Sequence, residues 1–570
     1  MRLREGRPRE TTSLSMNLER PATSMEPTPS AWSPFGHAGF TAIWIASLVM
    51  NIGNAMFDTS SAWLMTSLNA DPIVVARVQV FSSLPVFLFT LPAGAIADII
   101  DARRFLIAAQ VASIAVIAAF AALVSFNLAS PPALLLTTFV LSALISLTGP
   151  AWLSIAPLLV NRPELDGAIA ANGVGYNISR AVGPAITGVV IAGLGIAAPF
   201  WIDGVAYVVV VGTLLWWRSP RKSMESLPAE RLSSAVRTGL RYAANNQHLR
   251  ATVIRALAFA PFASAYWALL PLVARSQMVE GPALYGAMVG ALGVGATAGS
   301  FALNWLKAKI GPDRVVDVGT LATAFALVLF GFARHPFIAL SACVVAGAAW
   351  TVVVTSLYVS AQVALPDWVR GRGLAILLAA IFGAMTIGSA LWGHVAAVEG
   401  LSTAHFIAAA GALAAIPLTL RWKLQTAVGI DLSPSMHWRA PVVAKQIDNN
   451  QGPVLVTVEY RVEPKHRAEF ASALDELGQE RKRDGAFAWG VFEDVADVGR
   501  FVETFLIESW LELMYQHERV TNADRVREDH IRQLLSESPK VTHLIASRRR
   551  RRLAAPAIDA PLPAQDAPTK

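Results

Sequence analysis

The sequence predicts an all-α membrane protein of about twelve transmembrane helices in two six-helix halves, followed by a small α+β domain. Of the 570 residues, 54% are hydrophobic and only 15% are charged, whereas soluble domains carry about 25% charged residues. Apolar runs of about twenty residues, long enough to cross a bilayer, recur with short connections. Near residue 453 the pattern changes to short β-like runs that alternate with amphipathic stretches.

The apolar runs fall into two sets of six. The first set covers about 39–62, 73–97, 105–126, 133–158, 168–193 and 196–217, and the second covers about 251–274, 283–306, 315–333, 337–363, 373–397 and 403–421. These spans predict a tail at 1–38, a first half at 39–217, a linker at 218–250 and a second half at 251–423.

Basic residues predict the orientation of the chain. They gather on the side of the 218–250 linker, while the opposite connections hold little beyond Arg275 and Arg334. By the positive-inside rule, we expect a multi-pass protein of the inner or plasma membrane with both termini and the linker in the cytoplasm. The net charge of +7 therefore reflects topology and contact with membrane lipid, and it does not indicate nucleic-acid binding. The polar first 35 residues lack the apolar core of a signal peptide.

The region 453–547 predicts a separate cytoplasmic domain. Val454 to Tyr460 is typical of a strand, 464–483 of an amphipathic helix, 487–492 and 500–507 of two more strands, 508–535 of a broken helix, and 541–546 of a last strand. The order β-α-β-β-α-β indicates a ferredoxin-like fold. A basic and then Pro/Ala-rich tail follows at 548–570.

One charged turn separates the second and third runs. It reads Gly94-Ala-Ile-Ala-Asp98-Ile-Ile-Asp101-Ala-Arg103-Arg104. This spacing resembles the corresponding loop of major facilitator superfamily transporters, roughly Gly-x-x-x-Asp-x-x-Gly-x-Arg-Arg/Lys. Asp101 stands where that pattern usually has glycine, and this departure resembles the drug and enterobactin-type exporter branch.

The resemblance implies the major facilitator fold and a role for the turn as a conformational latch. Asp98 would pair with Arg103 or Arg104, or cap the helix that starts after Arg372, in the outward-facing state. The alternative is a purely topological turn that keeps bases on the inner side.

The fifth run carries a second point of resemblance. Its segment Ser179-Arg180-Ala-Val-Gly183-Pro184-Ala-Ile-Thr187-Gly resembles the exporter-associated pattern Gly-x-x-x-Gly-Pro-x-x-Gly-Gly, with Ser179 and Thr187 in place of two glycines. In the family this segment is tied to antiport direction. Small residues and a proline also suit simple kinked helix packing, and both interpretations can hold.

Polar residues inside the spans are the candidates for substrate and proton sites, because they are costly to place in lipid. Asp58 is the first choice for proton coupling and Asp203 the second, against structural pairing or capping as the alternative. The cavity candidates are Asn51, Asn54, Asn172, Tyr176, Thr351, Thr355 and Tyr358. Helix–helix hydrogen bonding is the alternative for the stripe at 351–358.

These features predict a secondary transporter that exports a small molecule, such as a drug, a siderophore or a secondary metabolite, in exchange for protons. No phosphate-binding loop, metal-ligand cluster or catalytic residue is recognisable, so we expect no cofactor and no enzyme activity in the helices. The first rival is an importer of the same fold. The second starts from the resemblance of residues 489–521 to the soluble tail of this exporter branch and to antibiotic-biosynthesis-monooxygenase-type domains. It makes this domain an oxygenase or a ligand sensor, and the domain could also support dimerisation.

Overall fold

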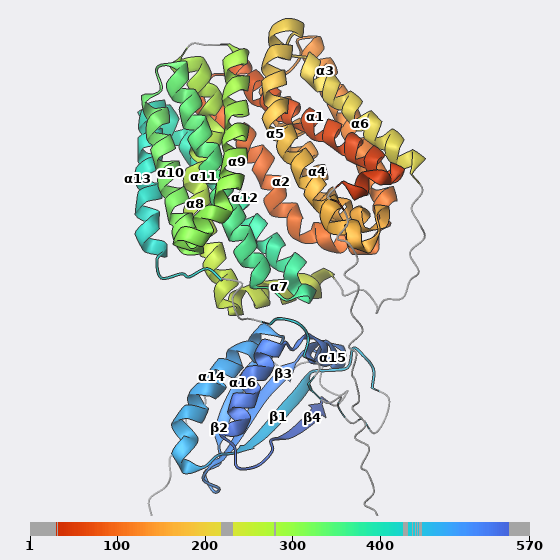
Figure 1. Ribbon diagram of the computed structural model, residues 1–570, viewed down its shortest axis with the longest axis vertical. Helices are drawn as coiled ribbons and strands as arrows, with labels where there is room; N and C mark the ends of the chain where they lie inside the picture. Colours follow the sequence, from red (N-terminus) through yellow and green to blue (C-terminus); the bar gives the residue numbers. More distant parts are fainter. Residues whose placement is uncertain are drawn as a thin grey trace, which may run out of the picture.

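The computed structural model describes residue 30 and residues 32–217, 232–278, 281–425, 431–435, 437–438, 441, 443 and 447–546. Among these residues, twelve helices are long and apolar enough to cross a membrane. They form two bundles side by side, and an α/β domain lies beyond one end of them (Figure 1). The expectation of two six-helix halves with a small α+β domain is thereby confirmed.

The first half contains six membrane helices. They are α1 (Ala38–Leu68), α2 (Pro72–Ile99), α3 (Ala102–Ser125), α4 (Pro131–Leu159), α5 (Leu165–Leu194) and α6 (Ala198–Trp216), with short 3₁₀ turns η1 (Ser33–Gly36) and η2 (Arg162–Glu164). Prolines begin several of these helices, where their missing N–H groups cost nothing.

The second half repeats this order after a short linker helix, α7 (Leu232–Asn245). Its membrane helices are α8 (Gln247–Leu272), α9 (Pro282–Ile310), α10 (Pro312–Phe332), α11 (Pro336–Val363), α12 (Asp367–Glu399) and α13 (Leu401–Thr419), and a π-helical turn, η3 (Val273–Gln277), extends α8. The most basic part of the predicted linker, 218–231, lies outside the described residues.

The α/β domain has a four-stranded antiparallel sheet in the order β2-β3-β1-β4. Its elements are β1 (Val454–Arg461), η4 (Pro464–His466), α14 (Arg467–Arg483), β2 (Phe487–Glu493), β3 (Arg500–Ile507), α15 (Trp510–Arg519), α16 (Asn522–Gln533) and β4 (Lys540–Ile545). This is the ferredoxin-like arrangement expected from the sequence. Thr521 breaks the last helical stretch because it forms a capping box with Asp524 at the start of α16.

We call the side of the bundles that carries α7 and the α/β domain the domain side, and the opposite side the far side (Figure 1). The two halves are closely packed in their far-side parts. A Cβ added to Gly286 of α9 would stand 2.7 Å from the Pro184 carbonyl oxygen of α5, and one added to Gly393 of α12 would stand 2.5 Å from the Ala76 Cβ of α2. Arg275 closes the same side, since its Nη1 donates to Ser67 Oγ at 2.6 Å.

The domain-side ends of the same helices are not packed in this way. A Cβ added to Gly94 of α2, Gly149 of α4, Gly173 of α5 or Gly371 of α12 would have no other element within 4 Å. Among the described residues, the close glycine contacts between the two halves therefore lie toward the far side.

Two expectations require correction, one about the start of a helix and one about an arginine side chain. The helix expected at 373–397 begins at Asp367, because Pro366 supplies its N-cap and extended backbone, so Arg370 and Arg372 lie within its first turns. The place of Arg255 near the inner end of its apolar run predicts a side chain that extends toward the membrane surface, and this prediction is wrong. Arg255 of α8 is buried, and its guanidinium pairs with Asp317 at 3.0 Å and Asp313 at 3.4 Å.

Candidate functional site: polar groups between the two halves

Asp58 of α1 and Arg180 of α5 lie close enough to interact electrostatically. The side chain of Asp58 keeps accessible surface, while its helix neighbours Phe57 and Thr59 are buried. The Arg180 guanidinium also lies 5.7 Å from the ring centroid of Trp267 on α8, at cation–π distance. One arginine thus links an acid of the first half to an aromatic ring of the second half.

Asp203 lies deeper, on α6, and is fully buried. Neither of its carboxylate oxygens has a hydrogen-bond partner among the described residues. Gly53 of α1 permits the close approach, because a Cβ there would stand 2.5 Å from Asp203 Oδ1. Asp58 is near enough to act on Asp203 electrostatically, and one turn away Tyr207 donates its hydroxyl to Asn54 Oδ1 at 2.8 Å. Two acids of the first half therefore share one polar region.

The exporter-type segment of α5 lies at a junction of three helices. A Cβ on Gly183 would stand 2.7 Å from the Ala55 Cβ of α1, and the Pro184 carbonyl oxygen faces Gly286 of α9. This segment therefore sets how closely α5 packs on its own half and on the other half.

The remaining cavity candidates occupy a range of environments. Asn51, Asn54, Thr351, Thr355 and Tyr358 are half-buried, and Asn172 and Tyr176 are exposed. Tyr176 lies beside Arg180, with 5.8 Å between the guanidinium carbon and the ring centroid. On α11 it is Trp350, not the predicted polar stripe, that packs against Trp267, with ring centroids 5.9 Å apart.

The charged turn lies at the domain-side end of α2 and α3. Asp101 caps α3 by accepting a hydrogen bond from the Arg104 N–H at 2.9 Å. Arg103 donates to the Leu214 and Leu215 carbonyl oxygens at the end of α6, at 2.8 and 3.0 Å. The side chain of Asp98 lies outside the described residues, so its role as a latch stays a prediction.

Two contacts were not foreseen from the sequence. The sequence assigns Arg180 only to the α5 motif, and for Arg77 in the second run it allows either a position at the outer membrane surface or a pairing with Asp58 or Asp203. Among the described residues Arg77 is exposed and forms no ion pair. The signal that could have identified Arg180 and Arg255 is that an arginine inside a span needs an acid on a neighbouring helix.

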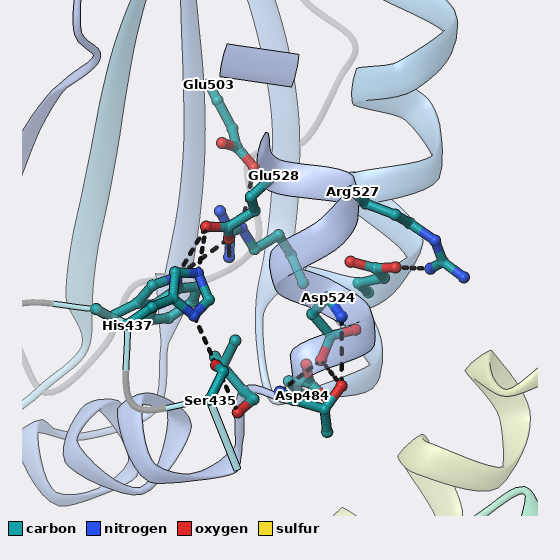
Figure 2. A network of polar contacts seen from close by, with 12 residues as sticks. Ser435, His437, Asp484, Glu503, Asp524, Arg527 and Glu528 are labelled. Carbon is teal, nitrogen blue, oxygen red and sulfur yellow. Dashed lines mark hydrogen bonds and ion pairs between the residues drawn. The ribbon is translucent and has the colours of Figure 1, made fainter. Parts of the chain in front are cut away.

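The interior of the α/β domain holds a second polar cluster (Figure 2). Glu503 of β3 is fully buried and accepts hydrogen bonds from the Tyr460 hydroxyl at 2.7 Å and the Trp489 indole at 2.9 Å. Glu528 of α16 accepts from His437 at 2.8 Å and from Trp438 at 3.0 Å. Arg481 of α14 lies between the two acids and pairs with Glu528 at 3.1 Å.

His437 and Trp438 belong to the segment between α13 and β1. We call its described part, residues 431–435 and 437–438, the strap. It runs along the junction of α15 and α16, where Ser435 donates its N–H to the Val520 carbonyl oxygen at 2.9 Å and Pro434 forms an isolated β-bridge with Thr521. The strap thus supplies two side chains to the polar interior of the domain.

Twelve apolar helices in two like halves, with two acids inside the first half and an arginine that reaches a tryptophan of the second, define a membrane transporter of the major facilitator class. The chain belongs to the transmembrane secretion effector family, whose model matches residues 29–551 and therefore includes the α/β domain.

Known proteins support this assignment. The chain is 24% identical over 415 residues to the multidrug efflux pump Tap of Mycobacterium tuberculosis. The matched region covers 71% of this chain and 97% of that protein. It is 23% identical to the pump of the same name from Mycolicibacterium fortuitum, over 63% of this chain and 89% of that one. Similar solved structures include the nucleoside transporter NupG (TM-score 0.52, 13% identity, covering 68% and 99% of the two chains). A bacterial homologue of the iron transporter ferroportin in an inward-facing state is also similar (TM-score 0.53, 14% identity, covering 67% and 98%).

Proposed function

We propose that this transporter exports small molecules by alternating access and that proton movement through Asp58 drives the export. The observation that carries the proposal is the placement of Asp58 near Arg180, which itself contacts Trp267 of the second half. Protonation would remove the charge of Asp58 and its attraction to Arg180. The contacts of Arg180 with both halves would then differ between the protonated and the deprotonated state, which couples the proton to the arrangement of the halves.

Export is the direction that the relatives support, since the two similar curated proteins are named multidrug efflux pumps. The aromatic rings of Trp267, Trp350 and Phe259 lie together on the second half. Phe259 is buried, so the half-buried Trp267 and Trp350 provide the accessible aromatic surface, which suits apolar and aromatic substrates with little demand for one shape. Drugs, siderophores and other secondary metabolites all remain candidate substrates.

We place the domain side in the cytoplasm. The described bases at that side include Arg103, Arg104, Lys307, Lys309 and Arg372, while Arg275 and Arg334 lie at the far side. The positive-inside rule then sets both termini in the cytoplasm. In that orientation the closely packed far side faces outward, as in a transporter that takes up its substrate from the cytoplasm.

Transport in inverted membrane vesicles tests the proposal. With an imposed proton gradient, vesicles that contain the protein should accumulate a fluorescent dye substrate, and Asp58→Asn should reduce the initial rate at least about tenfold. Glu399→Gln is the matched control, because Glu399 is an exposed acid at the far-side end of α12. If Asp58→Asn transports at the parent rate, Asp58 is not the coupling site. If an uncoupler leaves accumulation unchanged, proton antiport is wrong.

An importing transporter is the rival of the same fold, and it would deplete the dye from inverted vesicles. The rival for the α/β domain is an oxygenase. The active site of such an oxygenase would lie in the interior of the domain (Figure 2). That interior is occupied by Glu503, Arg481, Glu528 and Trp438 of the strap. Oxidation of a quinol by the purified full chain, lost on Trp489→Phe, would support that rival.

Dimerisation through the α/β domain has a specific surface. One sheet face carries the helices, and the other presents Phe487, Leu506, Leu455 and Leu544 in one row across the four strands. Phe487 and Leu544 are 43% and 52% exposed. A second copy could cover this apolar row face to face. Light scattering should then show a dimer for the parent chain and a monomer for Leu544→Glu.

A further inference from the structure

A cavity lies at the seam between the membrane helices and the α/β domain. Its volume is about 310 Å³, and its walls come from the start of α12, from α15 and from the strap. Trp368 stands on the membrane side of the cavity, Tyr515 and Arg519 on the domain side, and Leu432 on the strap. The volume is at the lower end of the range for small-molecule sites.

Ion pairs and ring contacts hold the seam together. The Arg519 guanidinium lies 4.3 Å from the ring centroid of Trp368 and 5.0 Å from that of Tyr515. Its Nη1 donates to Glu512 at 2.7 Å. Arg241 of α7 approaches the same carboxylate at 3.6 Å. Arg519 is therefore held in the cavity wall by one acid and two aromatic rings.

Three charged side chains line the cavity, the acids Asp367 and Glu518 and the largely covered Arg519. The side chain of Arg519 is only 5% exposed, because its partners cover it. The Asp367 carboxylate is 84% exposed, even though Arg370 of the next turn pairs with it. Glu518 is also exposed and has no ion-pair partner among the described residues. Accessible carboxylates beside Trp and Tyr rings are the groups that bind organic cations, through charge attraction and cation–π contact.

We propose that this seam cavity binds a small aromatic cation, with Glu518 as its counter-charge and Trp368 and Tyr515 as its stacking surfaces. The site is distinct from the polar region around Asp58, because it lies at the domain-side end of α12. It does not depend on proton coupling or on the direction of transport. One wall belongs to α12 of the second half and the other to the α/β domain. A bound cation therefore stabilises the contact between α12 and this domain.

Thiol protection in the purified full chain tests the site locally. The native chain has one cysteine, Cys343, which is buried in α11. In Leu432→Cys, a soluble maleimide therefore reacts at position 432, on the cavity wall. Saturating ethidium, a planar aromatic cation, should slow this reaction at least about fivefold. Phenanthridine, its neutral parent ring, should protect much less.

Two further variants separate the site from general effects. Adding Glu518→Gln to Leu432→Cys should weaken ethidium protection about threefold to fivefold, the size expected for an accessible charge pair. In the control Glu476→Cys, a position on the exposed face of α14, ethidium should leave the labelling rate unchanged. Absence of protection at position 432, equal protection by phenanthridine, or full protection after Glu518→Gln would each overturn the proposal. Dye transport by Asp58→Asn tests the pump separately, so the two proposals can fail independently.

Discussion

Asp203 is a buried acid that has no hydrogen-bond partner among the described residues. A carboxylate in such surroundings is costly unless it is paired or carries a proton. Gly53 brings the backbone of α1 against it, and Asp58 adds a second acid of the same region. If protons drive export as proposed, we expect the two neighbouring carboxyl groups to share the transported proton.

The substitution Asp203→Asn separates folding from coupling. A neutral amide costs less to bury than a charged carboxylate, so the melting temperature in detergent should stay the same or rise. Dye transport by the same preparation should fall by about tenfold, because one member of the pair can no longer carry a proton. A parent-like transport rate would assign Asp203 a purely structural role.

At the scale of the element, glycine residues let α9 pack closely on α5, and this contact joins the two halves. A Cβ added to Gly293 would stand 2.6 Å from the Ala181 Cα, which lies beside Arg180. Small residues here let two helices approach closely, as in other membrane helix pairs. The exporter-type segment of α5 thus serves both the packing of the halves and the position of Arg180.

We predict that Gly293→Ala impairs the closed far side. The added methyl group forces α5 and α9 apart at a cost of about 1–3 kcal/mol, so both the melting temperature and the dye transport rate should fall. Gly193→Ala on α5 is the control, because a Cβ there meets no other element within 4 Å. Equal behaviour of the two variants would show that the contact does not limit transport.

The α/β domain should respond to acid through Glu528. Burial alone would raise the pKa of this carboxyl group, but Arg481 and the hydrogen bonds from His437 and Trp438 outweigh burial and hold its pKa at about 2. The folded carboxyl group is thus more acidic than an unfolded one, whose usual pKa is 4.5. Its stabilising contribution is complete above pH 4.5 and is lost as the pH falls toward 2, by about 3 kcal/mol.

Urea titrations of the full chain at pH 5 and pH 3, followed by tryptophan fluorescence, measure this loss. The transition of the α/β domain should move to lower urea at pH 3 in the parent, and Glu528→Gln should shrink that movement. Glu476→Gln, an exposed acid of α14, should behave as the parent does. An unchanged pH dependence in Glu528→Gln would contradict the role of this network.

At the scale of the whole molecule, the close helix contacts between the halves lie in their far-side parts, away from the α/β domain (Figure 1). This is one of the two arrangements that alternating access requires. Its partner arrangement would bring the domain-side ends of α2 and α12 together. The turn that contains Asp98 and the first turns of α12 would then meet, which is where the resemblance to the superfamily places a latch.

Much of this architecture is predictable from the sequence, because hydropathy and chain length are properties of single segments. The twelve spans and the order of the α/β domain follow from them. Helix ends were less accurate, since charged residues such as Arg370 can continue a helix beyond its apolar run. The ion pair Arg255–Asp317 and the proximity of Asp58 to Arg180 join segments far apart in the chain. Hydropathy carries no information on such pairs, so they emerge only from the fold.

Proton flux driven by substrate tests the central claim most directly. Purified chain is reconstituted into liposomes that contain a pH indicator, with no imposed proton gradient, and a gradient of dye substrate is then applied. Proton antiport predicts that dye moving down its gradient drives protons the opposite way, with a pH change that Asp58→Asn abolishes and Glu399→Gln retains. Dye flux at the parent rate without any movement of protons would contradict the account.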